Sequence, residues 1–191
     1  MRLVAERCLS GLVCLGSALL ICGLAALLIT PERAVAEAEN LVTCTAGMHT
    51  IVWSPGLAND NHLVTVSARS YWGPCVSPDS ELAVSASSEQ RFQATFSCEA
   101  LRTLASPITW VIRWNDRATS TYTFNASLET EGDQRTTLLV GTGSIVEGRY
   151  KGAKAMTVFV LGDIDSKVSN ECASASGLTQ LSGTSMLIIS P

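Results

Sequence analysis

The sequence is short of charge and of histidine. Charged residues make up 16% of the 191 residues, against roughly 25% in typical globular proteins, and the formal net charge is -4. A dedicated nucleic-acid-binding protein would carry a basic excess, so that class is disfavoured. Only two histidines are present, which nearly excludes a metal site built from several of them. The hydrophobic fraction of 47% is too high for a disordered chain.

Two catalytic signatures are also missing. No C-x-x-C is present, so a thioredoxin-like redox site or a zinc knuckle has no support. No G-x-S-x-G is present, and Gly141-Thr142-Gly143-Ser144 falls in a predicted strand rather than at a nucleophile elbow. We therefore assign no catalytic residue, no cofactor site and no metal site, and the sequence favours a protein that is not an enzyme.

The first 36 residues have the layout of a secretory signal peptide. Arg2 and Arg7 precede an uncharged apolar run from Cys8 to Thr30, and Ala34-Val35-Ala36 supplies an A-x-A cleavage site. We predict cleavage after Ala36 and a secreted mature chain of residues 37–191. The apolar run is also long enough to cross a bilayer, so the alternative is a retained anchor with the remaining chain outside the cell.

Four cysteines remain after the predicted leader, and an even number in an exported chain indicates disulfides. A hairpin centred near Ala58 would place residue 44 opposite about residue 72, three residues from Cys75. Four cysteines allow three pairings, and this geometry favours Cys44 with Cys75 and Cys98 with Cys172.

The mature chain has the pattern of an all-β domain. In Thr119–Glu129, apolar residues alternate with polar ones, as in an antiparallel strand with one buried face. We predict a single antiparallel β-sandwich of about nine strands, with a closed β-barrel as the alternative. Only Glu99–Ala105 indicates a turn of helix. The other predicted strands are Cys44–Trp53, His62–Trp72, Leu82–Ala86, Arg91–Cys98, Ile108–Trp114, Thr136–Val146, Ala155–Leu161 and Leu178–Ser190.

The hairpin that follows Trp114 allows a sharper prediction. A three-residue loop, Asn115-Asp116-Arg117, pairs Trp114 with Ala118 and puts the tryptophans on the same face as Tyr122 and Phe124. A loop one residue longer would put them on the threonine face. Burying the aromatic residues together favours the shorter loop, which requires a left-handed conformation at Arg117.

Several residues are weak candidates for binding. His49 and His62 flank the first hairpin, and we expect both to face solvent. Asp163-Ile164-Asp165 resembles the start of a calcium loop but lacks the remaining ligands, so we expect a solvated turn. Aromatic residues crowd the first hairpin and are either core or a patch that binds a sugar or a protein; these are Trp53, Tyr71 and Trp72.

Five segments of the mature chain carry a resemblance: CTAGMHTIVWSPGL at 44–57, GPC at 73–75, ITWVIRWNDRATSTYTF at 108–124, GTGSIVEGRYKG at 141–152 and LSGTSMLII at 181–189. They resemble a family of small secreted β-rich proteins of actinomycetes that have no assigned function. The resemblance implies export and an all-β body, and it brings no catalytic residues. In that family the turn after Trp-Asn-Asp tends to carry glycine, where this chain has Arg117.

These observations predict a secreted, disulfide-stabilised β-sandwich that acts as a non-catalytic binding or structural module at or outside the cell surface. The expected partner is an extracellular protein or glycan, not a nucleic acid. One alternative is an extracellular hydrolase acting on a glycan or ester. Another is a membrane-anchored ectodomain that keeps its N-terminal apolar segment.

Overall fold

The described residues form nine strands and two short helices. The computed structural model describes residues 39–78, 84–102, 107–131 and 136–191, so the predicted signal peptide lies outside the described residues. The helices are the 3-10 helix η1 (Glu99–Arg102) and the α-helix α2 (Ile164–Glu171). The strands are β1 (Val42–Cys44), β2 (Gly47–Leu57), β3 (His62–Cys75), β4 (Val84–Phe96), β5 (Ile108–Trp114), β6 (Thr119–Glu131), β7 (Thr136–Gly148), β8 (Lys154–Gly162) and β9 (Leu178–Ser190).

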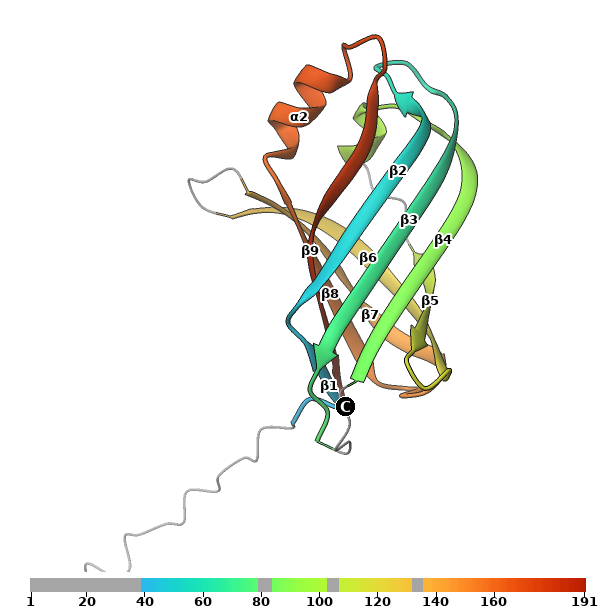
Figure 1. Cartoon of the computed structure of the whole chain (residues 1–191), viewed down its shortest axis with the longest axis vertical. Helices are drawn as coiled ribbons and strands as arrows, with labels where there is room; N and C mark the ends of the chain where they lie inside the picture. Colours follow the sequence, from blue (N-terminus) through green and yellow to red (C-terminus); the bar gives the residue numbers. More distant parts are fainter. Residues whose placement is uncertain (1–38, 79–83, 103–106, 132–135) are drawn as a thin grey trace, which may run out of the picture. The chain divides into compact units, whose positions relative to one another are not determined.

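Eight of these strands close into one antiparallel barrel. Strands β2 to β9 are neighbours in sequence order, and β9 pairs with both β8 and β2, which closes the sheet (Figure 1). The extra strand β1 continues along β9 where β2 stops, with Val42–Cys44 opposite Leu187–Ile189. The chain is therefore an all-β protein with one closed eight-stranded barrel and one added strand.

The predicted sandwich is wrong, and the barrel alternative is correct. A sandwich consists of two sheets packed face to face, whereas here a single sheet closes on itself through β9. Both architectures give each strand one buried and one solvated face. The alternating pattern in the sequence therefore cannot distinguish them.

Two local predictions also need correction. The expected strands Leu82–Ala86 and Arg91–Cys98 belong to one long strand, β4, although residues 82 and 83 lie outside the described residues. Helix α2 was not predicted, because its eight residues are too few to show a clear helical period. Asp163 caps it by accepting a hydrogen bond from Ser166 N at 2.9 Å, so the expected solvated turn is a helix start.

The hairpin between β5 and β6 has the predicted register. Trp114 N donates to Ala118 O at 2.9 Å, and Arg117 has a φ of 74°. Trp110 lies opposite Tyr122, so the tryptophans share the inner face with Tyr122 and Phe124. The tightly packed inner face includes Trp72, Tyr122, Phe159, Ile112, Ile145, Leu187 and Ile189.

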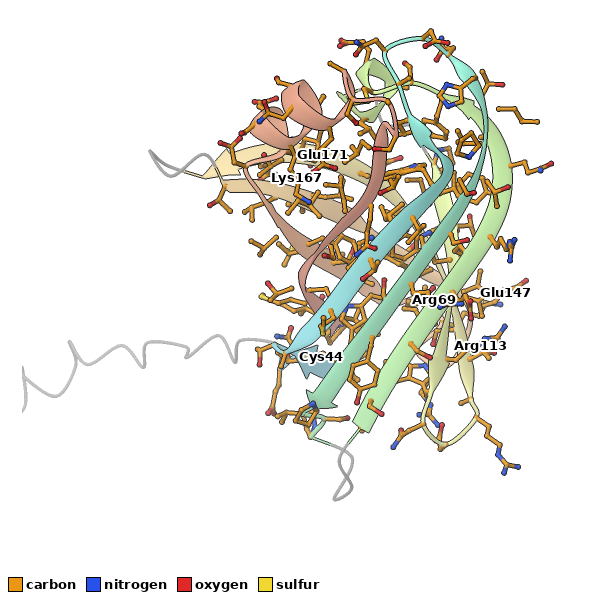
Figure 2. The ribbon with its side chains drawn as sticks, turned by 45° about the horizontal axis from the view of Figure 1, so that its top comes forward. Cys44, Arg69, Arg113, Glu147, Lys167 and Glu171 are labelled. Carbon is orange, nitrogen blue, oxygen red and sulfur yellow. A yellow bond between two sulfur atoms is a disulfide. The ribbon has the colours of Figure 1, made fainter. Side chains whose placement is uncertain are left out.

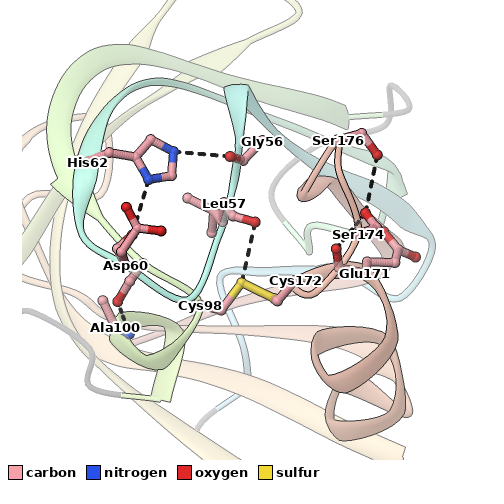
Figure 3. Close-up of a disulfide and its surroundings, with 11 residues drawn as sticks. Gly56, Leu57, Asp60, His62, Cys98, Ala100, Glu171, Cys172, Ser174 and Ser176 are labelled. Atoms are coloured by element: carbon pink, nitrogen blue, oxygen red, sulfur yellow. Dashed lines mark hydrogen bonds between the residues drawn. A yellow bond between two sulfur atoms is a disulfide. The ribbon is translucent and has the colours of Figure 1, made fainter.

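Two disulfides join the four cysteines in the pairing that the sequence favours. Gly47 pairs with Trp72, which moves the hairpin centre past Ala58 and places Cys44 opposite Cys75, with their Cα atoms 4.1 Å apart. The second bridge joins Cys98 to Cys172 with a Cα separation of 6.3 Å. It ties the start of η1 to the end of α2 (Figure 3), at the end of the barrel away from β1 (Figure 1).

Candidate functional site

The barrel wall is incomplete between β4 and β5. These strands pair only at Ala86 with Trp114 and at Ser87 with Arg113, whereas β3 pairs with β4 along nearly its whole length. Figure 1 shows the short β5 beside only the lower part of β4. We call the stretch where Ser88–Phe96 and Ile108–Ile112 do not pair with each other the β4–β5 gap.

The inner face of β4 at this gap is more exposed than the inner face of β3 beside it. Residues directly opposite each other in a ladder point to the same face, and Phe92 lies opposite Val66. Val66 is 5% exposed, but Phe92 is 49% exposed. Because β4 has no strand neighbour here on its β5 side among the described residues, its inward aromatic ring keeps contact with solvent.

Trp110 lies on the β5 side of the gap and is only partly buried. Its ring centroid lies 5.0 Å from Phe124, 5.7 Å from Phe159 and 5.8 Å from His49. No described residue accepts a hydrogen bond from its indole N–H. We call the four rings of His49, Trp110, Phe124 and Phe159 the aromatic cluster; three of its rings are buried, and partly buried Trp110 is its member at the gap.

His49 is the buried polar member of this cluster. It projects inward from β2, and its Nδ1 lies 2.7 Å from Ser70 Oγ. Burial lowers the pKa of His49 from 6.5 to about 4, so the ring is neutral at physiological pH. Its Nε2 is buried and has no partner within the described structure.

A row of polar side chains runs along the inner wall from His49 to the gap. His49 lies opposite Ser70, and Ser70 lies opposite Ser88, the first residue of β4 past the last β4–β5 pair. Ser88 Oγ is buried and has no described partner, like Thr157 Oγ1 and Trp72 Nε1. A buried polar group without a partner costs about 1–3 kcal/mol. Each of these atoms therefore lacks, among the described residues, the hydrogen bond that would offset its burial.

A hollow of about 340 Å³ lies on the outer face of the barrel, next to the gap. It contains Arg69, whose Nη2 lies 2.8 Å from Glu89 Oε1, and Arg113, which forms no ion pair with any described residue. Figure 2 shows both arginines on the same side of the barrel. The residues that line the hollow are Met48, Thr50, Arg69, Ser70, Tyr71, Ser87, Ser88, Glu89 and Arg113.

The structure separates the two histidines, and the prediction that His49 faces solvent is wrong. His49 shares its face with Ile51 and Trp53, at intervals of two residues along β2, and this spacing could have indicated burial. His62 lies near the second disulfide, with its ring nitrogens 3.1 Å from the carbonyl oxygens of Asp60 and Gly56 (Figure 3).

The other residues singled out in the sequence do not assemble a site. Trp53 and Trp72 are buried in the core, and only Tyr71 of that aromatic group is exposed.

In β7, a Cβ at Gly141 would lie 2.8 Å from the Phe124 ring, so this glycine lets the aromatic cluster approach the backbone.

The Ser70–His49 pair differs from a hydrolase triad. In such a triad the serine contacts one ring nitrogen and a carboxylate orients the other. Here no described carboxylate contacts Nε2, and both side chains are buried. The contact serves as a hydrogen bond inside the barrel, without the group that would orient a catalytic base.

The described residues hold no helix with the length and hydropathy needed to span a bilayer. Nor do they bring three or more histidine, cysteine, aspartate or glutamate side chains together for a metal ion. Comparisons with protein-family models, curated proteins and solved structures give no match. A functional proposal must therefore come from the residues of the β4–β5 gap.

Proposed function

We propose that the chain is an exported binding protein that takes a small apolar molecule through the β4–β5 gap. The observation that carries the proposal is the exposure of Phe92, an inward-pointing aromatic side chain, where the wall lacks strand pairing. The two disulfides are compatible with an extracellular site of action. Export leaves the barrel outside the cell whether the N-terminal segment is cleaved or retained as an anchor.

The chemistry of the gap supports a small apolar ligand rather than a macromolecule. Ligand sites are mostly apolar concave surfaces with a few polar groups that fix orientation. The gap combines the partly exposed rings of Phe92 and Trp110 with the unpartnered polar atoms of His49 and Ser88 deeper in the barrel. An eight-stranded barrel has an interior that side chains fill or that holds one small ligand.

A neutral fluorescent probe tests this proposal. N-phenyl-1-naphthylamine has no charge and fluoresces in an apolar environment, so we expect a saturable rise in emission with energy transfer from the tryptophans of the barrel. We expect Phe92→Ser to weaken binding about tenfold, because a ring contact worth about 1.5 kcal/mol is lost.

Leu63→Ser is the matched control, since Leu63 is an exposed apolar residue on the outer face of neighbouring β3. Equal loss of binding in the Phe92 and Leu63 variants would show general surface adsorption. No saturable binding to the unaltered protein would overturn the proposal.

A further inference from the structure

We propose that the ligand of the β4–β5 gap is an anionic amphipath whose carboxylate is held by Arg113 while its hydrocarbon part contacts Trp110 and Phe92. This inference rests on the proposed function and adds the ligand's charge and orientation. It joins the gap to the outer hollow, whose lining includes Arg113 and Ser88 where the β4–β5 pairing stops.

Arg113 marks the edge of the gap. It pairs with Ser87 in the last rung between β4 and β5, and its side chain is exposed on the outer face. Trp110 lies three residues away on the same strand, which corresponds to about 10 Å along the strand. A molecule with a polar head at Arg113 can therefore extend its apolar part past the strand edge to Trp110.

Charge complementarity selects an anion. Arg69 is already paired with Glu89, so the hollow retains the charge of Arg113. Arg91 adds a second exposed guanidinium on the outer face of β4 beside the gap, and it forms no ion pair with a described residue. Glu147 lies on β7, two strands from β5 and on the same side of the barrel as Arg113 (Figure 2), and no ion pair joins the two in the described structure.

Ser88 lies at the boundary between the outer hollow and the gap, directly after the last β4–β5 pair. It lines the hollow together with Arg113, and its hydroxyl is buried without a described partner. A guanidinium presents two parallel N–H donors that match a carboxylate. Arg113 therefore suits a terminal carboxylate better than an uncharged alcohol or an ammonium group.

Three ten-carbon molecules with different heads test the inference: decanoate, decan-1-ol and decyltrimethylammonium. Calorimetric titrations of the folded, disulfide-bonded protein, below the concentrations at which these molecules aggregate, should show decanoate binding at least tenfold more tightly than the other two. Raising the salt concentration should weaken decanoate binding and leave decanol binding unchanged.

The arginine variant locates the head group. Arg113→Gln should weaken decanoate binding about tenfold and leave decanol binding unchanged, since one charge-assisted pair is lost. Arg117→Gln is the matched control, because Arg117 is an exposed arginine in the loop that follows β5 and does not line the hollow. It should leave all three affinities unchanged.

The possible outcomes separate the two proposals. Equal binding of decanoate and decanol, or tighter binding of the ammonium compound, would overturn the charge preference and leave the apolar site intact. A decanoate preference that Arg113→Gln does not reduce would overturn the assigned residue. If none of the three molecules binds and the neutral probe also fails, the proposed function itself falls.

Discussion

Two tryptophans on the same face of β5 show how differently the two parts of the barrel are built. Trp114 lies where β4 and β5 pair; its Nε1 donates to Ser120 Oγ at 2.9 Å, and Ser120 Oγ donates to Arg149 O at 2.6 Å. The Arg149 guanidinium also lies 5.8 Å from the Trp114 ring and pairs with Asp116. The Trp114 ring is therefore covered by the Arg149 guanidinium, and its indole N–H has a hydrogen-bond acceptor.

Trp110 lies earlier on the same strand and on the same face, yet its surroundings are incompletely packed. It lies at the β4–β5 gap, is partly exposed, and has an indole N–H without a described acceptor. The residue type, strand and sheet face are the same for both. The difference arises from strand pairing, which completes the packing at Trp114 and leaves groups available for binding at Trp110.

Removing the disulfides gives the largest expected effects on stability. The bridges close separations of 31 and 74 residues, for which chain entropy predicts about 3.5 and about 4.5 kcal/mol of stabilisation. We expect Cys98→Ala with Cys172→Ala to lower the free energy of unfolding by slightly more than Cys44→Ala with Cys75→Ala. Denaturant titration of both double variants measures the difference. A clearly larger loss for the Cys44–Cys75 pair would contradict it.

Acid should destabilise the barrel through His49. Its folded-state pKa of about 4 lies below the ordinary value of 6.5, so the unfolded chain binds the proton more readily. The contribution of the neutral ring is complete above pH 6.5 and declines as the pH falls towards 4, by about 3 kcal/mol in all. Unfolding curves from pH 7 to 4 should show this decline relative to His49→Gln. Parallel curves for the two proteins would refute it.

Two isoleucines on β5 test the contrast between the paired and unpaired parts directly. Ile112 is fully buried and Ile108 is partly buried, and both point inward. We expect Ile112→Ala to cost about 3 kcal/mol and Ile108→Ala about 1 kcal/mol, because a cavity forms only where the surroundings are closed. Thermal and urea unfolding of the two variants gives the comparison. Equal costs would mean that the gap is packed as tightly as the rest of the barrel.

Local features of the fold could be predicted from the sequence, and closure could not. The position of the aromatic residues in β5 and β6 determined the hairpin register, because a shift of one residue would have exposed them. The closure of the sheet depends on β9 meeting β2, which are far apart in sequence. Alternation within each strand carries no information about that contact.

The candidate site could not be predicted from the sequence, because it too depends on strand pairing. Phe92 occupies an inward position of an alternating strand, which the sequence alone would assign to the core. Its exposure results from a strand pairing that stops at Ser87. We wrongly predicted that His49 faces solvent, because histidine more often does so. Its spacing from Ile51 and Trp53 nevertheless indicated an inward face.

The smallest expected effect concerns the loop at the paired end of β5. Arg117 has a φ of 74°, a left-handed conformation that costs a side-chain-bearing residue about 1–2 kcal/mol. Glycine removes that strain but adds freedom to the unfolded chain, so we expect Arg117→Gly to raise the free energy of unfolding by about 0.5 kcal/mol. Arg117→Ala removes the same side chain and keeps the strain, so it should bring no gain. Because the loop lies beyond the paired part of β5, neither variant should change decanoate binding, and a change in affinity would show that the two parts of the barrel are coupled.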